Sequence, residues 1–127
     1  MIHAEAEGAE TDKQQTHLIV ALDASGSMGT CFSSVKETLS MLYVKLARLG
    51  PLASNTLYVF NNDTVKYDFT GLSLDQTCLH VFGLTVNGGT NFTSVLKAIQ
   101  EHVHSGPPKA CYFVVFLTGR PDNALQT

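Results

Sequence analysis

Two uninterrupted apolar segments constrain the fold of this 127-residue chain more than any other feature. HLIVAL spans residues 17–22 and is followed at once by Asp23, and CYFVVFL spans residues 111–117. In segments this short, continuous rather than alternating hydrophobicity predicts a β-strand that is buried on both faces. Such strands are typical of parallel sheets with helices packed on either side.

Amphipathic helices are predicted between the two apolar strands. Apolar residues recur at spacings of three and four over residues 32–49, where Gly50 and Pro51 end the pattern. A second helical face runs over residues 92–103 and also ends in Gly and Pro. A shorter helix is expected around residues 75–82.

A hairpin completes the predicted elements. Residues 56–60 form a further strand, turn residues follow at 61–63, and residues 65–69 then alternate between apolar and polar. This order predicts an α/β three-layer sandwich of Rossmann type, with a mostly parallel sheet, right-handed crossovers and one antiparallel, half-exposed edge strand. Ligands of such sheets bind beyond the carboxyl ends of the strands, so the positions after Leu22 and Leu117 are the ones to inspect.

The length and composition indicate one globular domain. We expect an acidic, disordered leader at residues 1–16 and the domain itself at residues 17–127. Hydrophobic residues make up 44% of the chain and the net charge is -3, with no basic stripe. This charge pattern argues against nucleic acid and anionic membrane as partners.

The cysteines predict a reducing environment. Cys31, Cys78 and Cys111 have no metal-ligand spacing, and an odd number cannot pair completely within one chain. Cys111 opens an apolar strand, so it is expected to be a small core residue. The simplest location is intracellular, in the cytoplasm. We therefore do not interpret the Asn-x-Thr triplets at Asn62 and Asn91 as glycosylation sites.

The residues after the first strand have the chemistry of a metal site. Asp23, Ser25 and Ser27 form D-x-S-x-S, and alternate residues of an extended segment point the same way. One carboxylate and two hydroxyls can therefore converge on one point, and oxygen ligands of this kind suit a hard cation such as Mg²⁺. The low negative charge would leave the metal able to accept a carboxylate from elsewhere.

Three motifs together resemble the von Willebrand factor A domain and its metal-ion-dependent adhesion site, which integrin inserted domains share. They are D-A-S-G-S-M-G at 23–29, G-G-T-N at 88–91 and T-G-R-P-D at 118–122. The resemblance implies a non-enzymatic, protein-binding module that holds Mg²⁺, Mn²⁺ or Ca²⁺. The ligands it implies are Asp23, Ser25, Ser27 and Thr90. A protein partner would complete the coordination with a Glu or Asp, against a surface that includes Gly26, Met28, Gly89 and Asn91.

The sequence departs from the family pattern in two places. The family has an Asp directly after the position of Thr118, and here Gly119 follows, so Thr118 and Asp122 become the candidates for that role. The family's sheet also has strand order 3-2-1-4-5-6, whereas this chain stops at Thr127. We therefore expect the domain to be incomplete at its C-terminus, with residues 111–117 at a sheet edge that another chain could pair with.

Simpler interpretations remain for each motif. Asp23 and the two serines could form a helix N-cap and a polar turn, Thr90 could cap the following helix, and Met28 could be a packing residue below the site. Two other functions also remain. One is a degenerate, metal-free scaffold of the same fold. The other is a phosphatase-like hydrolase of the haloacid dehalogenase type, which would use Asp23 and Thr118 but lacks the second acid at Ser25.

Overall fold

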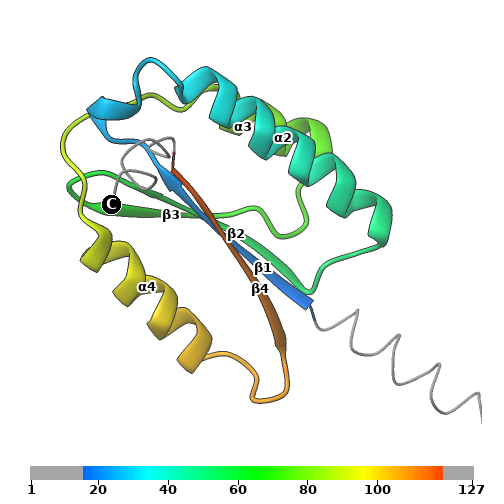
Figure 1. The fold of residues 1–127 in the computed structure, drawn as a ribbon. Coiled ribbons are helices and arrows are strands. Elements are labelled where there is room, and N and C mark those ends of the chain that lie inside the picture. The colour runs from blue at the N-terminus through cyan, green and yellow to red at the C-terminus, as the bar shows by residue number, and fades with distance from the viewer. Residues whose placement is uncertain (1–15, 119–127) are drawn as a thin grey trace, which may run out of the picture.

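The computed structural model describes residues 16–118 of the chain, which form a single four-stranded sheet with helices on both faces (Figure 1). The elements are β1 (Thr16–Asp23), the 3-10 turn η1 (Gly26–Met28), α2 (Phe32–Leu49), β2 (Ser54–Phe60), β3 (Thr64–Asp68), α3 (Leu74–Phe82), α4 (Phe92–His104) and β4 (Cys111–Leu117). The strand order is β3-β2-β1-β4. β1 is parallel to β2 and β4, and β3 is antiparallel to β2.

The α/β sandwich predicted from the sequence is confirmed. Helices α2 and α3 cover one face of the sheet and α4 covers the other (Figure 1). β1 supplies both cores, because Leu18 and Val20 face the α2 side whereas Ile19 and Ala21 face α4. All four of these side chains are fully buried, as expected for a continuous apolar strand at the centre of a parallel sheet.

The predicted element bounds are close to the observed ones. Thr16, which we placed in the leader, is the first residue of β1, and residues 1–15 lie outside the described part of the chain. α3 begins at Leu74 because Ser73 and Gln76 form a capping box, each side chain bonding the other residue's backbone N–H. Within residues 16–118, no helix combines the length and the apolar character that crossing a membrane requires.

β4 lies at the edge of the sheet, and this position overturns one prediction. Cys111, which we expected to be a small core residue, is exposed. The exposure continues along the strand, where Phe113 is 48% exposed and Phe116 is 38% exposed. The apolar pattern predicts a strand correctly, but the burial of that strand depends on neighbours, and β4 has a described neighbour on one side only.

Candidate metal centre at the end of β1

Asp23 is the last residue of β1 and lies at the carboxyl edge of the sheet. Its register partner on β2 is Phe60, and β4 ends beside it at Leu117. The next residues of both neighbouring strands, together with the loops before α2 and α4, are therefore gathered at one edge. This is the edge at which sheets of this type bind ligands.

The Asp23 carboxylate is fully buried and is held by two hydrogen bonds. Oδ1 accepts from the backbone N–H of Ser25 at 3.0 Å, and Oδ2 accepts from the Thr118 hydroxyl at 3.2 Å. No Lys, Arg or His side chain within residues 16–118 forms an ion pair with it. The sequence-predicted candidates Asp23 and Thr118 are thus in contact, although 95 positions separate them.

The two serine hydroxyls of the motif converge, although Ser27 lies in the 3-10 turn η1 and not on the extended segment that the alternation of D-x-S-x-S assumes. Ser25 Oγ and Ser27 Oγ lie 3.1 Å apart. Ser25 is 1% exposed, whereas Ser27 is exposed, so the pair leads from the buried carboxylate to the surface. Ser25 is the N-cap residue of η1, but its side chain makes no capping hydrogen bond. Ser25 therefore occupies an N-cap position without a side-chain cap, whereas the polar turn of the simpler interpretation is present in the hydrogen bond from Ser25 N–H to Asp23.

The Gly-rich loop before α4 is hydrogen-bonded to the Asp23 loop. Gly26 N–H donates to Gly88 O at 2.8 Å, and Asn87 N–H donates to Ala24 O at 2.9 Å. Gly88 has φ +72°, a backbone conformation that side chains disfavour. The close approach of the two loops therefore depends on glycine at this position.

Asn62, in the β2–β3 turn, contacts the Gly-rich loop from its other side, a role for which the sequence carries only a weak signal. Its Oδ1 accepts from Gly89 N–H at 2.9 Å, and its backbone oxygen accepts from Asn91 Nδ2 at 3.3 Å. A Cβ on Gly88 or Gly89 would lie within 2.8 Å of the Asn62 amide. The weak signal that existed is an Asn in a turn at the carboxyl edge of the sheet, where a side chain can reach neighbouring loops.

Thr90 lies in the same loop, half-buried, and does not cap α4. That role belongs to Asn91, whose side-chain oxygen accepts from Ser94 N–H at 3.0 Å. Among the described residues, no hydrogen bond joins Thr90 directly to Asp23, Ser25 or Ser27. The fold brings Thr90 to the correct edge without placing it in contact with the other candidates.

The residues expected to face a partner divide into two groups. Gly26, Gly89 and Asn91 are exposed around the site. Met28 is fully buried in the core below it and packs on the α2 side of the sheet. Met28 is therefore a packing residue in this structure, and Asp122 lies outside the described residues.

The donor set at this edge is made of oxygen atoms. Over residues 16–118, no group of three or more His, Cys, Asp or Glu side chains is arranged to hold a metal ion. The candidate centre has a different composition, with a single carboxylate bonded to the Thr118 hydroxyl and with the paired hydroxyls of Ser25 and Ser27 in the segment that follows. Hard, oxygen-preferring cations such as Mg²⁺ match this set, whereas zinc, which favours Cys and His, does not.

Comparison with known proteins supports the fold alone. No protein-family model matches the chain. A crystal structure described as an uncharacterized membrane spanning protein from Vibrio fischeri is similar, with a TM-score of 0.56 and 14% sequence identity. The similarity covers 73% of this chain and 52% of that one, so this chain spans about half the length of its structural neighbour.

Proposed function

We propose that this protein binds an acidic protein partner through a divalent cation, Mg²⁺ or a similar hard ion, held at the end of β1. The proposed ligands are Asp23, Ser25, Ser27 and Thr90. The proposal rests on the oxygen donors at this edge and on the resemblance of the motifs that supply them to metal-ion-dependent adhesion sites.

The observation that carries the proposal is the burial of Asp23 without a cationic partner. A carboxylate that is 0% exposed loses its hydration, and buried charges in proteins are normally paired or coordinate a metal. The two hydrogen bonds from Ser25 N–H and the Thr118 hydroxyl offset only part of that loss. A divalent cation beside Asp23 would offset much more of it.

The chain's own groups have separate roles in this proposal. Asp23 supplies the negative charge, and the hydroxyls of Ser25 and Ser27 supply neutral oxygen ligands. A bound divalent ion would supply a positive charge with an open coordination position. Because Asp23 is the single carboxylate of the proposed set, the centre would keep a net positive charge. It would therefore attract a Glu or Asp side chain of the partner.

The test is a calorimetric titration of Mg²⁺ and Mn²⁺ into the wild-type chain and two variants. We expect saturable binding that Asp23→Ala weakens more than about tenfold, because removing a charged ligand removes the main attraction. Asp63→Ala is the matched control, since Asp63 is an exposed carboxylate in the nearby hairpin turn. It should bind as the wild type does.

Two results would overturn the proposal. Absence of binding by folded wild-type protein would leave a metal-free scaffold, in which Asp23 serves the fold through its hydrogen bonds to Ser25 and Thr118. Mg²⁺-dependent hydrolysis of a generic phosphate ester, lost in Asp23→Ala, would instead identify a phosphatase.

A further inference from the structure

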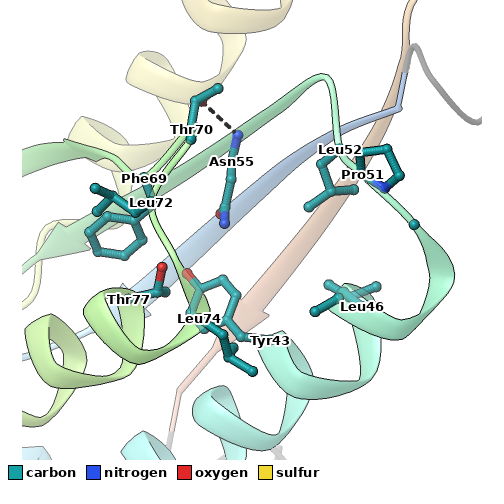
Figure 2. Close-up of a pocket in the computed structure, with 13 residues that line it drawn as sticks. Tyr43, Leu46, Pro51, Leu52, Asn55, Phe69, Thr70, Leu72, Leu74 and Thr77 are labelled. Atoms are coloured by element: carbon teal, nitrogen blue, oxygen red, sulfur yellow. Dashed lines mark hydrogen bonds between the residues drawn. The ribbon is translucent and has the colours of Figure 1, made fainter.

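A second candidate site lies at the opposite end of the sheet. A cavity of about 430 Å³ is formed between the C-terminal half of α2, the loop that enters β2, and the segment from β3 to α3 (Figure 2). Its walls include Tyr43, Leu46, Leu52, Asn55, Phe69 and Leu74. Asn55 pairs with Leu18 near the start of β1, which places the cavity far from Asp23 along the strand.

Two side chains that line this cavity each bury a polar atom, just behind the cavity wall, that has no hydrogen-bond partner among the described residues. These atoms are the hydroxyl of Tyr43 and Oδ1 of Asn55. Tyr43 is only 3% exposed, and burial raises the pKa of its hydroxyl, which therefore stays protonated. Figure 2 shows the Asn55 side-chain amide pointing from β2 toward the Tyr43 and Thr77 side chains.

These unpaired atoms are costly to the fold. A buried polar group without a partner destabilises a protein by about 1–3 kcal/mol. Phe in place of Tyr43 could keep the ring's packing, including its edge-to-face contact with Phe69 at 6.2 Å, without burying a hydroxyl. Thr77, by contrast, bonds its hydroxyl to the Ser73 carbonyl at 3.0 Å and needs no external partner. A ligand that bonds to Tyr43 and Asn55 would remove the cost.

The lining also restricts the charge and the size of such a ligand. None of the residues that line the cavity is Asp, Glu, Lys, Arg or His. A charged ligand would lose hydration without gaining a counter-charge, which disfavours its binding. The volume falls within the range of about 300–1,000 Å³ that is usual for small-molecule sites, and apolar walls with few polar groups are typical of them.

We propose that this cavity binds an uncharged, amphipathic small molecule that presents a hydroxyl or amide group to Tyr43 and Asn55, whose buried oxygen atoms a small shift of the two side chains uncovers. The apolar body of the ligand packs against Leu46, Leu52 and Phe69. A hydroxyl suits both polar atoms, because it donates to Asn55 Oδ1 and accepts from the Tyr43 hydroxyl. The proposal does not depend on metal binding at Asp23.

The test uses 2-naphthol as the probe, with 2-naphthoate as its charged counterpart. Amide chemical shifts of the isotope-labelled, full chain are followed by NMR during each titration. We expect 2-naphthol to shift the residues that line the cavity in a saturable way. The charged 2-naphthoate should bind at least about tenfold more weakly, because the cavity holds no cation.

A pair of tyrosine variants isolates the polar contact. Tyr43→Phe should weaken 2-naphthol binding by about 3–10-fold, the usual effect of one hydrogen bond, while leaving the fold at least as stable. Tyr112→Phe is the matched control, since the Tyr112 hydroxyl is also buried and unpaired within the described chain but lies outside the cavity. It should bind 2-naphthol as the wild type does.

Three results would each overturn the proposal. They are no saturable shift of the cavity residues by 2-naphthol, equal binding of 2-naphthoate, and unchanged binding by a folded Tyr43→Phe. Should Tyr43→Phe fail to fold, the comparison of the two probes on wild-type protein decides the question alone.

Discussion

The Asp23 carboxylate is fully buried, so the cost of burying its charge depends on the groups that surround it. Both of its oxygens accept hydrogen bonds, one from the backbone N–H of Ser25 and one from the hydroxyl of Thr118, which directly follows β4. The neighbouring hydroxyls of Ser25 and Ser27 bond to each other and cap no helix with their side chains. The proposed site is therefore arranged around a single buried carboxylate.

Thr118 provides a direct test of this arrangement. In metal-free protein, Thr118→Val removes the hydroxyl that donates to Asp23 Oδ2, so the free energy of unfolding should fall by about 1 kcal/mol. Urea denaturation measures it. Thr93→Val is the control, because Thr93 is an exposed threonine on α4. Equal stability of the two variants would mean that this hydrogen bond does not support the buried carboxylate.

His102 predicts a pH dependence of stability. Burial lowers the pKa of His102 below its ordinary value of 6.5, the positive charges of Lys66 and His17 lower it further, and Asp68 opposes them. The unfolded chain therefore binds a proton more readily than the folded one. The contribution of neutral His102 to stability is complete above about pH 6.5 and is lost as the pH falls through the folded pKa.

This dependence is measured by urea denaturation at about pH 7.5 and about pH 5.5. His102→Gln removes the titrating group and keeps an acceptor for the Tyr58 hydroxyl, which lies 2.7 Å from His102 Nδ1. The variant should lose less stability on acidification than the wild type. His104→Gln, on the exposed side of the same helix, should behave as the wild type does. An unchanged pH response in His102→Gln would refute the assignment.

At the level of elements, the sequence predicts most of the secondary structure because local patterns determine it. Consecutive residues determine both the apolar periodicity of α2 and its end before Gly50 and Pro51, and the structure shows both. The predicted burial of Cys111 was wrong, because the burial of a strand depends on its neighbours in space. The D-x-S-x-S motif was recognisable for the same reason as α2, since it occupies one short segment, but its local geometry was not, because Ser27 lies in a 3-10 turn and not on an extended segment.

Other contacts could not be predicted from local patterns. Asn62 reaches the Gly-rich loop across 27 positions, and Tyr43 and Asn55 meet at one cavity from two different elements. Each is an ordinary turn, helix or strand residue in its own segment. Their roles arise only when the sheet brings distant segments together, so no spacing in the sequence signals them.

One such contact joins α2 to the end of α3. Lys36 on α2 donates to the backbone oxygens of Phe82 and Leu84 at 2.9 Å, where α3 ends and its carbonyls carry partial negative charge. Lys36→Met should lower the free energy of unfolding by about 1–2 kcal/mol. Lys45→Met, which changes an exposed lysine of the same helix, should cost less than about 0.5 kcal/mol. Similar losses in the free energy of unfolding of the two variants would argue that Lys36 does not stabilise the packing of α3 on α2.

At the scale of the whole molecule, β4 pairs with a strand on one side only within residues 16–118, and an open apolar edge favours association. Phe113 and Val114 are 48% and 41% exposed on this strand. We expect the protein to associate with increasing concentration, and Phe113→Lys to reduce that association because a charge on an edge strand opposes pairing. Sedimentation velocity at several concentrations measures this. Val65→Lys, on the opposite edge strand β3, is the control and should leave association unchanged.

The molecule also carries its two proposed sites at opposite ends of one sheet. The proposed cation site lies at the carboxyl end of β1, and the cavity at Tyr43 and Asn55 lies near the start of β2. Helix α2 runs between them, with Phe32 at the first end and Leu46 at the second. A bound ligand can therefore be assigned to one of the two proposed sites by the end of the sheet at which the backbone amide signals change.

The most direct test of the central claim is the site at which a paramagnetic ion binds. Mn²⁺ is added in small amounts to isotope-labelled protein, and the broadening of each backbone amide signal is recorded. We predict that Ser25, Ser27 and Gly89 broaden first, that Asn55 does not, and that Asp23→Ala abolishes the effect. Broadening centred on exposed carboxylates such as Asp75, or the same broadening in Asp23→Ala, would contradict a metal centre at the end of β1.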